Sequence, residues 1–204
     1  MRKTSALAVL DFADIPTGVW AVDAILKKAP IAFLRAGTVT RGRYLVLFGG
    51  STASTAESLE EARATTGKAI LDHAFLADVH PALFEAVTGT RRPASGSLLV
   101  IETETASSIV RAVEAALKGT PVDLIEMRLS DSGLAGKGFA MLAGSLHDVE
   151  AAAVLAGAGA GVDALAPLGF TYRLIAAPHD IVGRITAATR FETAPLLELD
   201  GEAS

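Results

Sequence analysis

The chain has 204 residues, of which half are hydrophobic and none is cysteine, and its formal net charge is −5. The lack of cysteine excludes disulfides, thiolate zinc sites, cysteine-ligated iron–sulfur clusters and thiol nucleophiles, and the acidic balance argues against a nucleic-acid partner. The mean hydropathy is +0.42, yet no apolar run approaches the roughly 18 residues of a membrane span. Asp11 and Asp14 interrupt the N-terminal apolar run, which argues against a signal peptide. We therefore expect a cytoplasmic protein with no membrane partner, whose excess apolar surface is buried between subunits.

The first half of the chain predicts alternating strands and helices. Asp14 or Thr17 offers an N-cap for an amphipathic helix. A loop bounded by Gly37 and Gly42 is typical of a hairpin between two strands. In chain order we expect a strand at 6–10, a helix at 17–28, strands at 31–36 and 43–48, a helix at 57–66, a strand at 69–77 and a short helix at 81–87.

The second half repeats the first. Leu10–Lys27 aligns with Ile101–Lys118 at an offset of 91 residues, and from Gly42 and Gly136 onward the offset is 94. The loop between the second and third strands has therefore gained three residues in the second copy. The second copy predicts a strand at 97–101, a helix at 106–118, strands at 122–129 and 137–143, a helix at 146–156, a strand at 170–176 and a helix at 180–188.

A repeat of this length has the size of a small domain, so we predict two tandem domains. Each copy should form an α+β sandwich, with a four-stranded antiparallel sheet and helices on one face. We expect a first domain at residues 1–90, a linker at 91–96, a second domain at 97–191 and an acidic tail at 192–204.

Motifs that could carry catalysis or bind a cofactor fail on their context. The run Gly157–Gly161 follows a helix, whereas a dinucleotide-binding loop follows a strand, so we interpret it as a helix end or a close helix contact. The histidines lack metal-ligand spacing, and His80 and His179, which follow equivalent strands, are assigned to fold geometry. The acids Asp11 and Glu102 recur with the repeat and are predicted to cap helices or to lie at an interface. We predict no enzyme activity, no cofactor and no metal site.

The ordered segments of each copy resemble the bacterial microcompartment (BMC) shell domain. The first copy has ALAVLD, AVDAILKKAPI, TRGRYLVLFGG and DVHP, and the second has SLLVIE, AVEAALKGTPV, LAGKGFAMLAGS and APHD. Two such domains in one chain, both in unpermuted order, resemble the tandem shell proteins, whose homotrimers imitate a hexamer. The resemblance implies a structural protein of a microcompartment shell in the cytoplasm. It also implies flat tiles with a central pore for small metabolites, assembled with hexameric tiles and pentameric vertices.

The same resemblance implies where the site residues lie. In this family the lysine that ends the first helix lies at the tile edge, here Lys27 and Lys118, and the loop between the second and third strands lines the pore. Arg41 and Ala135 replace the small polar pore residue common in the family, and the longer second loop implies a three-fold pore. Some tandem members hold an iron–sulfur cluster through pore cysteines, which this chain lacks. The matching pore positions are Thr40, Arg41, Gly42, Leu134, Ala135 and Gly136.

Alternatives stay open at this point. Arg41 could turn outward and pair with a nearby acid instead of facing the pore. The chain could instead be a trimeric small-molecule sensor of similar α+β fold, with a ligand cleft between its two domains and no lateral assembly. An enzyme of undetected mechanism would need convergent polar groups that the sequence does not offer.

Overall fold

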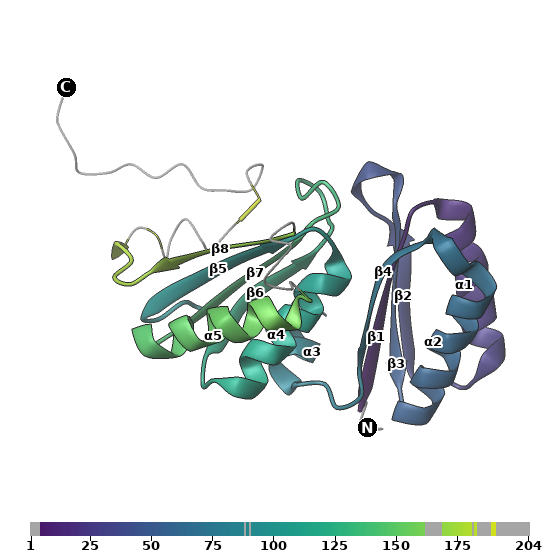
Figure 1. The fold of residues 1–204 in the computed structure, drawn as a ribbon, viewed down its shortest axis with the longest axis horizontal. Helices are drawn as coiled ribbons and strands as arrows, with labels where there is room; N and C mark the ends of the chain where they lie inside the picture. The colour runs from purple at the N-terminus through teal and green to yellow at the C-terminus, as the bar shows by residue number, and fades with distance from the viewer. Residues whose placement is uncertain are drawn as a thin grey trace.

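The computed structural model describes residues 5–87, 89, 91–161, 169–180, 182, 189 and 190. Figure 1 shows two similar halves side by side, each built from a sheet and helices. Both sheets have four strands, and all neighbouring strands are antiparallel. These observations confirm the α+β class and the four-stranded antiparallel sheets. No helix among the described residues is long and apolar enough to cross a membrane.

The first half forms a sheet with the strand order β2-β3-β1-β4. The two middle strands are the most buried, and residues of β1 are buried on both faces. The elements are, in chain order, β1 (Ala6–Phe12), α1 (Ile15–Lys28), β2 (Phe33–Thr38), β3 (Tyr44–Gly50), α2 (Thr52–Thr66), β4 (Ile70–Leu76) and α3 (Pro81–Val87), with 3-10 turns at Thr40–Gly42 and Gly67–Ala69.

The second half forms a sheet with the equivalent order β6-β7-β5-β8. Strand register confirms the repeat at the level of single residues, because Ala74 lies opposite Val9 in the first sheet and Arg173 lies opposite Val100 in the second. The elements are β5 (Ser97–Thr103), α4 (Ala106–Gly119), β6 (Asp123–Leu129), β7 (Gly138–Gly144), α5 (Leu146–Gly159) and β8 (Phe170–Ile175).

Several elements begin or end outside their predicted bounds, since their caps and pairing partners lie there. Helix α1 starts at Ile15 because the Asp14 side chain accepts a hydrogen bond from the Thr17 backbone N–H at 2.9 Å. Helix α2 starts before residue 57 because Ser51 caps it in the same way. Strand β1 continues through Phe12 because it pairs with β3 as far as Tyr44. The predicted helix at 180–188 lies largely, and the predicted tail at 192–204 wholly, outside the described residues.

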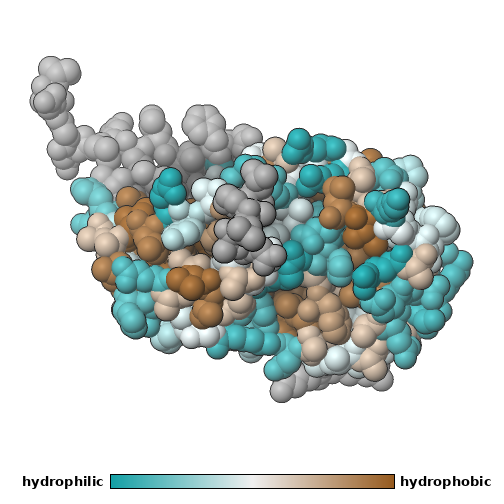
Figure 2. All heavy atoms as spheres, in the orientation of Figure 1, coloured by the Kyte–Doolittle hydropathy of each residue, from teal (hydrophilic) through white to brown (hydrophobic). Residues whose placement is uncertain are grey.

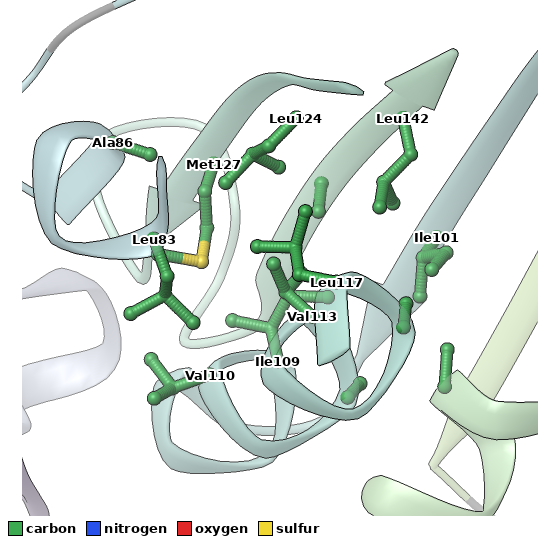
Figure 3. Packing of buried hydrophobic residues seen from close by; sticks show 14 of the residues in the cluster. Leu83, Ala86, Ile101, Ile109, Val110, Val113, Leu117, Leu124, Met127 and Leu142 are labelled. Carbon is green, nitrogen blue, oxygen red and sulfur yellow. The ribbon is translucent and has the colours of Figure 1, made fainter. Parts of the chain in front are cut away.

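Helix α4 links the two halves. One of its faces covers its own sheet, and it also contacts β1 and β4 of the first sheet. One buried apolar cluster contains Leu7 and Val9 of β1 together with Ile109, Val110 and Val113 of α4. Figure 3 shows these α4 residues beside side chains of α3, β5, β6 and β7. The halves therefore share a core, and α4 is buried on two sides.

The glycine run at the C-terminal end of α5 serves helix packing. A Cβ atom at Gly159 would lie 2.6 Å from the Ala115 Cβ and 2.7 Å from the Arg111 carbonyl oxygen of α4. Helix α5 ends at Gly159, and Gly161 then adopts a left-handed φ of +80°. The interpretation of Gly157–Gly161 as a helix end with a close helix contact is confirmed.

Candidate functional site

The two loops predicted to line a pore lie against each other between the two halves, at the upper edge of the view in Figure 1. The first loop joins β2 to β3, and the second joins β6 to β7. The Thr40 hydroxyl oxygen accepts a hydrogen bond from the Gly136 backbone N–H at 2.8 Å. The same hydroxyl donates to the Ser130 carbonyl oxygen at 3.2 Å. These two bonds join loop tips that lie far apart in the sequence.

The two loops also share an unusual backbone conformation. Arg41 and Gly42 have φ values of 68° and 71°, and their repeat equivalents Ala135 and Gly136 have 50° and 87°. A left-handed residue other than glycine costs on the order of 1 kcal/mol. That the same pair of left-handed residues occurs in both copies shows that the turn is a retained feature of the repeat. The turn presents residues 41 and 135 at the tips.

The Arg41 side chain is exposed, and its guanidinium donates to the Ala135 carbonyl oxygen at 3.5 Å. Within the described part of the chain, Arg41 forms no ion pair with a carboxylate. A nearby acid, Glu102 of β5, is instead bound by Lys137 at 2.6 Å. That hydrogen bond, together with the attraction between the two charges, raises the pKa of Lys137. Among the described residues, Arg41 therefore does not turn outward to pair with an acid.

A second arginine, which the sequence did not single out as a site residue, fastens the two loops. The Arg43 guanidinium donates to the Gly136 carbonyl oxygen at 3.1 Å and to the Glu104 carbonyl oxygen at 3.4 Å. A Cβ atom at Gly136 would lie 2.8 Å from this guanidinium, so glycine leaves room for the arginine. The only sequence signal was the retained positive charge at Arg43 and Lys137, which the repeat places at equivalent positions.

Below the loops, charged groups lie in the seam between the first sheet and α4. Asp11 is fully buried and accepts a hydrogen bond from the Ser107 backbone N–H at 3.1 Å. This confirms the prediction of a helix-capping or interface role for Asp11. Burial raises the pKa of Asp11 to about 6, against the opposing effects of the Ser107 hydrogen bond and the Arg43 charge. Beside it, Arg111 of α4 binds Asp72 of β4 at 2.9 Å.

The two lysines predicted for a tile edge lie in the last turns of α1 and α4. The Lys27 side chain is 75% exposed and pairs with Asp23. The Lys118 side chain is 47% exposed, pairs with Glu114 and donates to the Asp78 carbonyl oxygen of the first half. Glu114 in turn accepts from the His80 backbone N–H. Lys118 therefore also fastens the seam between the halves.

Comparison with known proteins agrees with this duplicated architecture. The family model described as the BMC domain matches the chain twice, at residues 6–79 and 97–168. The chain belongs to the BMC domain family. A relative of this BMC chain is the bacterial microcompartment shell protein PduT of Citrobacter freundii, which is 27% identical over 186 residues, covering 89% of this chain and 97% of PduT.

Solved structures place the BMC chain in the same family. It aligns with a microcompartment protein from Desulfitobacterium hafniense DCB with a TM-score of 0.74 and 28% identity, covering 89% of this chain and 99% of that one. The fused permuted hexameric shell protein of the RMM microcompartment has a TM-score of 0.57 at 20% identity, covering 76% of this chain and 84% of that one. At that identity the likeness concerns the fold alone.

The BMC chain also has a cavity of about 960 Å³ between its halves, bordered by β2, β6 and the end of α3. The sensor alternative would place its ligand here. The charges on the β6 side are already engaged, because Glu126 binds Arg91 at 2.5 Å and Arg128 binds Asp131 at 2.7 Å. No group of three or more metal-ligating side chains is found in the described residues.

Proposed function

We propose that three copies of this structural shell protein close into a ring that imitates a hexamer and forms one tile of a microcompartment shell, with a metabolite pore at its centre. The contact between Thr40 and Gly136 is the observation that carries the proposal. A chain in which two equivalent loops already touch needs only three-fold symmetry to surround an axis with six of them. Closed rotational symmetry is the usual state of homo-oligomers.

Thr40, Arg41, Gly42, Leu134, Ala135 and Gly136 would then face the axis. Three Arg41 side chains around one narrow axis would lie within a Debye length of one another, which is about 8 Å at physiological salt, so their charges would be screened only in part. Like charges in a narrow ring focus a positive potential that favours anions over cations. The uncharged Leu134 and Ala135 alternate with them, so the opening would select by charge at three points and by size at three others.

Lateral contacts between tiles would involve Lys27 and Lys118, which lie near the ends of their helices with exposed side chains. A long lysine side chain can lie along a neighbour's surface and donate to its carbonyl oxygens. The partners of such an edge would be further copies of the tile, hexameric tiles and the pentameric vertices that close a shell. The assembly would lie in the cytoplasm, where the shell separates small metabolites from their surroundings.

The sensor alternative rests on the cavity between the halves. It predicts binding of a specific metabolite and no lateral assembly. The paired charges of Arg91, Glu126, Arg128 and Asp131 favour a structural role for that side of the cavity, because binding a charged ligand there would require those ion pairs to open.

Two measurements on the purified protein test the proposal. Light scattering should report three chains per particle at micromolar concentration, and electron microscopy of concentrated protein should show sheets or tubes. The substitution Lys27→Glu should remove the sheets and leave the particle mass unchanged, whereas Lys68→Glu, the same charge change on the exposed turn after α2, should preserve them. Monomers throughout, or trimers that never associate laterally in the wild type, would refute the proposal.

A further inference from the structure

Below the loops, the first sheet carries two acids side by side on the face that meets α4. Strand pairing places Asp11 of β1 directly opposite Asp72 of β4. The Arg111 guanidinium binds both carboxylate oxygens of Asp72, at 2.9 and 3.1 Å, and the Thr105 hydroxyl donates to one of them. Like charges directly opposite each other on neighbouring strands oppose each other's ionisation. Since Asp72 has the partners that favour its charge, the geometry disfavours a second charge on Asp11.

Asp11 has far less support for a negative charge. Its side chain is fully buried, and Ser107 donates to one of its carboxylate oxygens through the backbone N–H at 3.1 Å and through the hydroxyl at 3.4 Å. The other oxygen has no hydrogen-bond partner among the described residues. Burial is the main cause that raises the pKa of Asp11 to about 6; the charge of Asp72 acts in the same direction, and that of Arg43 opposes it. Asp11 is therefore neutral in acid and ionised at higher pH.

Arg43 is the cation with which an ionised Asp11 can pair. It directly precedes β3 in extended conformation, and Leu45, two residues later, lies opposite Asp11. Because side chains alternate along an extended chain, Arg43 and Asp11 are diagonal neighbours on the same face of the sheet, within reach of a long side chain. Within the described part of the chain, Arg43 forms no ion pair with a carboxylate, whereas Arg111 is already engaged by Asp72.

The bonds that Arg43 makes instead hold the second loop. One guanidinium nitrogen, Nη1, donates to the carbonyl oxygens of Gly136 and Glu104 at 3.1 and 3.4 Å. Gly136 follows Ala135 at the tip of the second loop, and Figure 2 shows hydrophilic residues at the upper edge of the molecule, where both loops lie. Arg43 thus connects the buried acids of the seam to a loop tip at the surface.

The second copy shows what the equivalent acid and base do when the acid is ionised. Glu102 and Lys137 occupy the places of Asp11 and Arg43, and they form a direct ion pair at 2.6 Å. The residue opposite Glu102 on β8 is Thr171, so no second acid opposes its charge. The two positions are therefore close enough for an acid and a base to bind each other.

We propose that Arg43 positions the second pore loop under the control of a proton on Asp11. With Asp11 neutral, the guanidinium stays on the two carbonyl oxygens of the second half. When Asp11 releases its proton to solvent, the buried carboxylate needs a partner, and a hydrogen bond between two charged groups is shorter and stronger than one to a neutral carbonyl oxygen. The guanidinium then moves to Asp11, as the base of the second copy has done, and the second loop loses this support.

The movement of the loop needs only a single chain, whereas its effect on a pore rests on the proposed function. The second loop carries Leu134 and Ala135, which would form the uncharged part of the pore wall. The Ala135 carbonyl oxygen also accepts the hydrogen bond from Arg41. Releasing this loop would therefore loosen the apolar wall and the support of the charged residue together, and the pore would be best defined below about pH 6.

Hydrogen exchange of the second loop tests the proposal, because the backbone N–H groups of Leu134, Gly136 and Lys137 all donate within or between the loops. Exchange is followed by mass spectrometry and corrected for the intrinsic effect of pH. Protection of this loop in the wild type should fall at least about fivefold between pH 5 and pH 7.5. Asp11→Asn should keep the higher protection at both pH values, and Arg43→Ala should show the lower protection at both.

Asp23→Asn is the matched control, since it makes the same chemical change on the exposed surface of α1 and should leave the response of the loop intact. Equal protection of the wild type at both pH values would overturn the proposal. A response that survives in Asp11→Asn would assign the proton to another group, and one that survives in Arg43→Ala would remove Arg43 as the link; either result refutes it. Circular dichroism checks the fold of each variant, and the wild type with Asp11→Asn decides the case if Arg43→Ala does not fold.

The oligomeric state is measured separately by light scattering on the same samples. A monomer whose loop responds to pH as expected would refute the proposed function and support the control of Arg43 by Asp11. A trimer whose loop does not respond would do the reverse.

Discussion

Replacing Asp11 by asparagine should change how the stability of the protein depends on pH. The carboxyl group is fully buried, and burial raises its pKa from the ordinary value of 3.8 to about 6. One pKa unit corresponds to about 1.4 kcal/mol, so the shift amounts to roughly 3 kcal/mol of destabilisation once the group is ionised. The folded state binds the proton more tightly than the unfolded state. The cost is therefore absent below both pKa values, grows as the pH rises from about 4 to 6, and is constant above.

The measurement is urea unfolding of the wild type and of Asp11→Asn at several pH values and one protomer concentration, because the stability of an assembly depends on concentration. From about pH 4.5 to about pH 7.5, the wild type should lose roughly 2 kcal/mol relative to the variant. The test uses this change with pH of the difference in unfolding free energy, and not the absolute gain in stability of the variant. One carboxylate oxygen of Asp11 has no hydrogen-bond partner among the described residues, so a buried amide there would offset part of the gain.

Glu102→Gln is the matched control, because Glu102 occupies the equivalent place in the second copy but is partly exposed and bound by Lys137. Its variant should show no comparable change over the same pH range. The reasoning is refuted if the free-energy difference between wild type and Asp11→Asn is the same at both ends of the range. That result would mean that Asp11 stays ionised in the folded protein throughout.

Three further predictions concern the loops and the tile edge. Arg41→Glu should invert the charge preference of assembled layers, slowing small carboxylates while leaving neutral solutes little affected; equal anion flux through both layers would remove Arg41 from the pore field. Lys27→Glu should abolish sheets seen by electron microscopy without changing the particle mass, and normal tiling by the variant would contradict the edge assignment. Gly136→Ala places a methyl group 2.8 Å from the Arg43 guanidinium at a residue with φ +87°, so thermal unfolding should show destabilisation of about 1–2 kcal/mol; an unchanged melting temperature would show that the two loops do not depend on this contact.

Much of the fold was accessible from the sequence because the duplication supplied each prediction twice. The helix predicted at 106–118 is α4 at Ala106–Gly119, and the short helix at 81–87 is α3 with the same bounds. The predicted start of α2 at residue 57 was wrong. The helix begins after the polar cap Ser51, and its first turn has no apolar periodicity that would mark it in the sequence. Propensity alone could not locate that start.

The site was predicted only in part, because repeat matching finds positions and not contacts. It located both loops through the retained Gly42 and Gly136, but it did not predict the left-handed conformation of Arg41 and Ala135. It did not find Arg43, whose contacts reach across 93 and 61 residues of chain. It also could not show that Arg111 binds Asp72, because the repeat gives tryptophan at the position of Arg111 and threonine at that of Asp72. The positions at which the two copies differ therefore matter for the contact between the halves, and the identical positions do not reveal it.

Those departures have a physical reason if the ring forms as proposed. The seam between β1 and α4 lies within one chain, where covalent linkage keeps the two surfaces at high effective concentration. It can therefore tolerate a buried carboxyl such as Asp11 and the partly buried pair of Asp72 with Arg111, although buried charges add little net stability. The seam between chains has no such linkage and must assemble from dilute solution, which favours apolar and aromatic contacts. A ring of six identical domains would have to use one chemistry at every seam, whereas the duplicated chain can use one chemistry within each chain and another between chains.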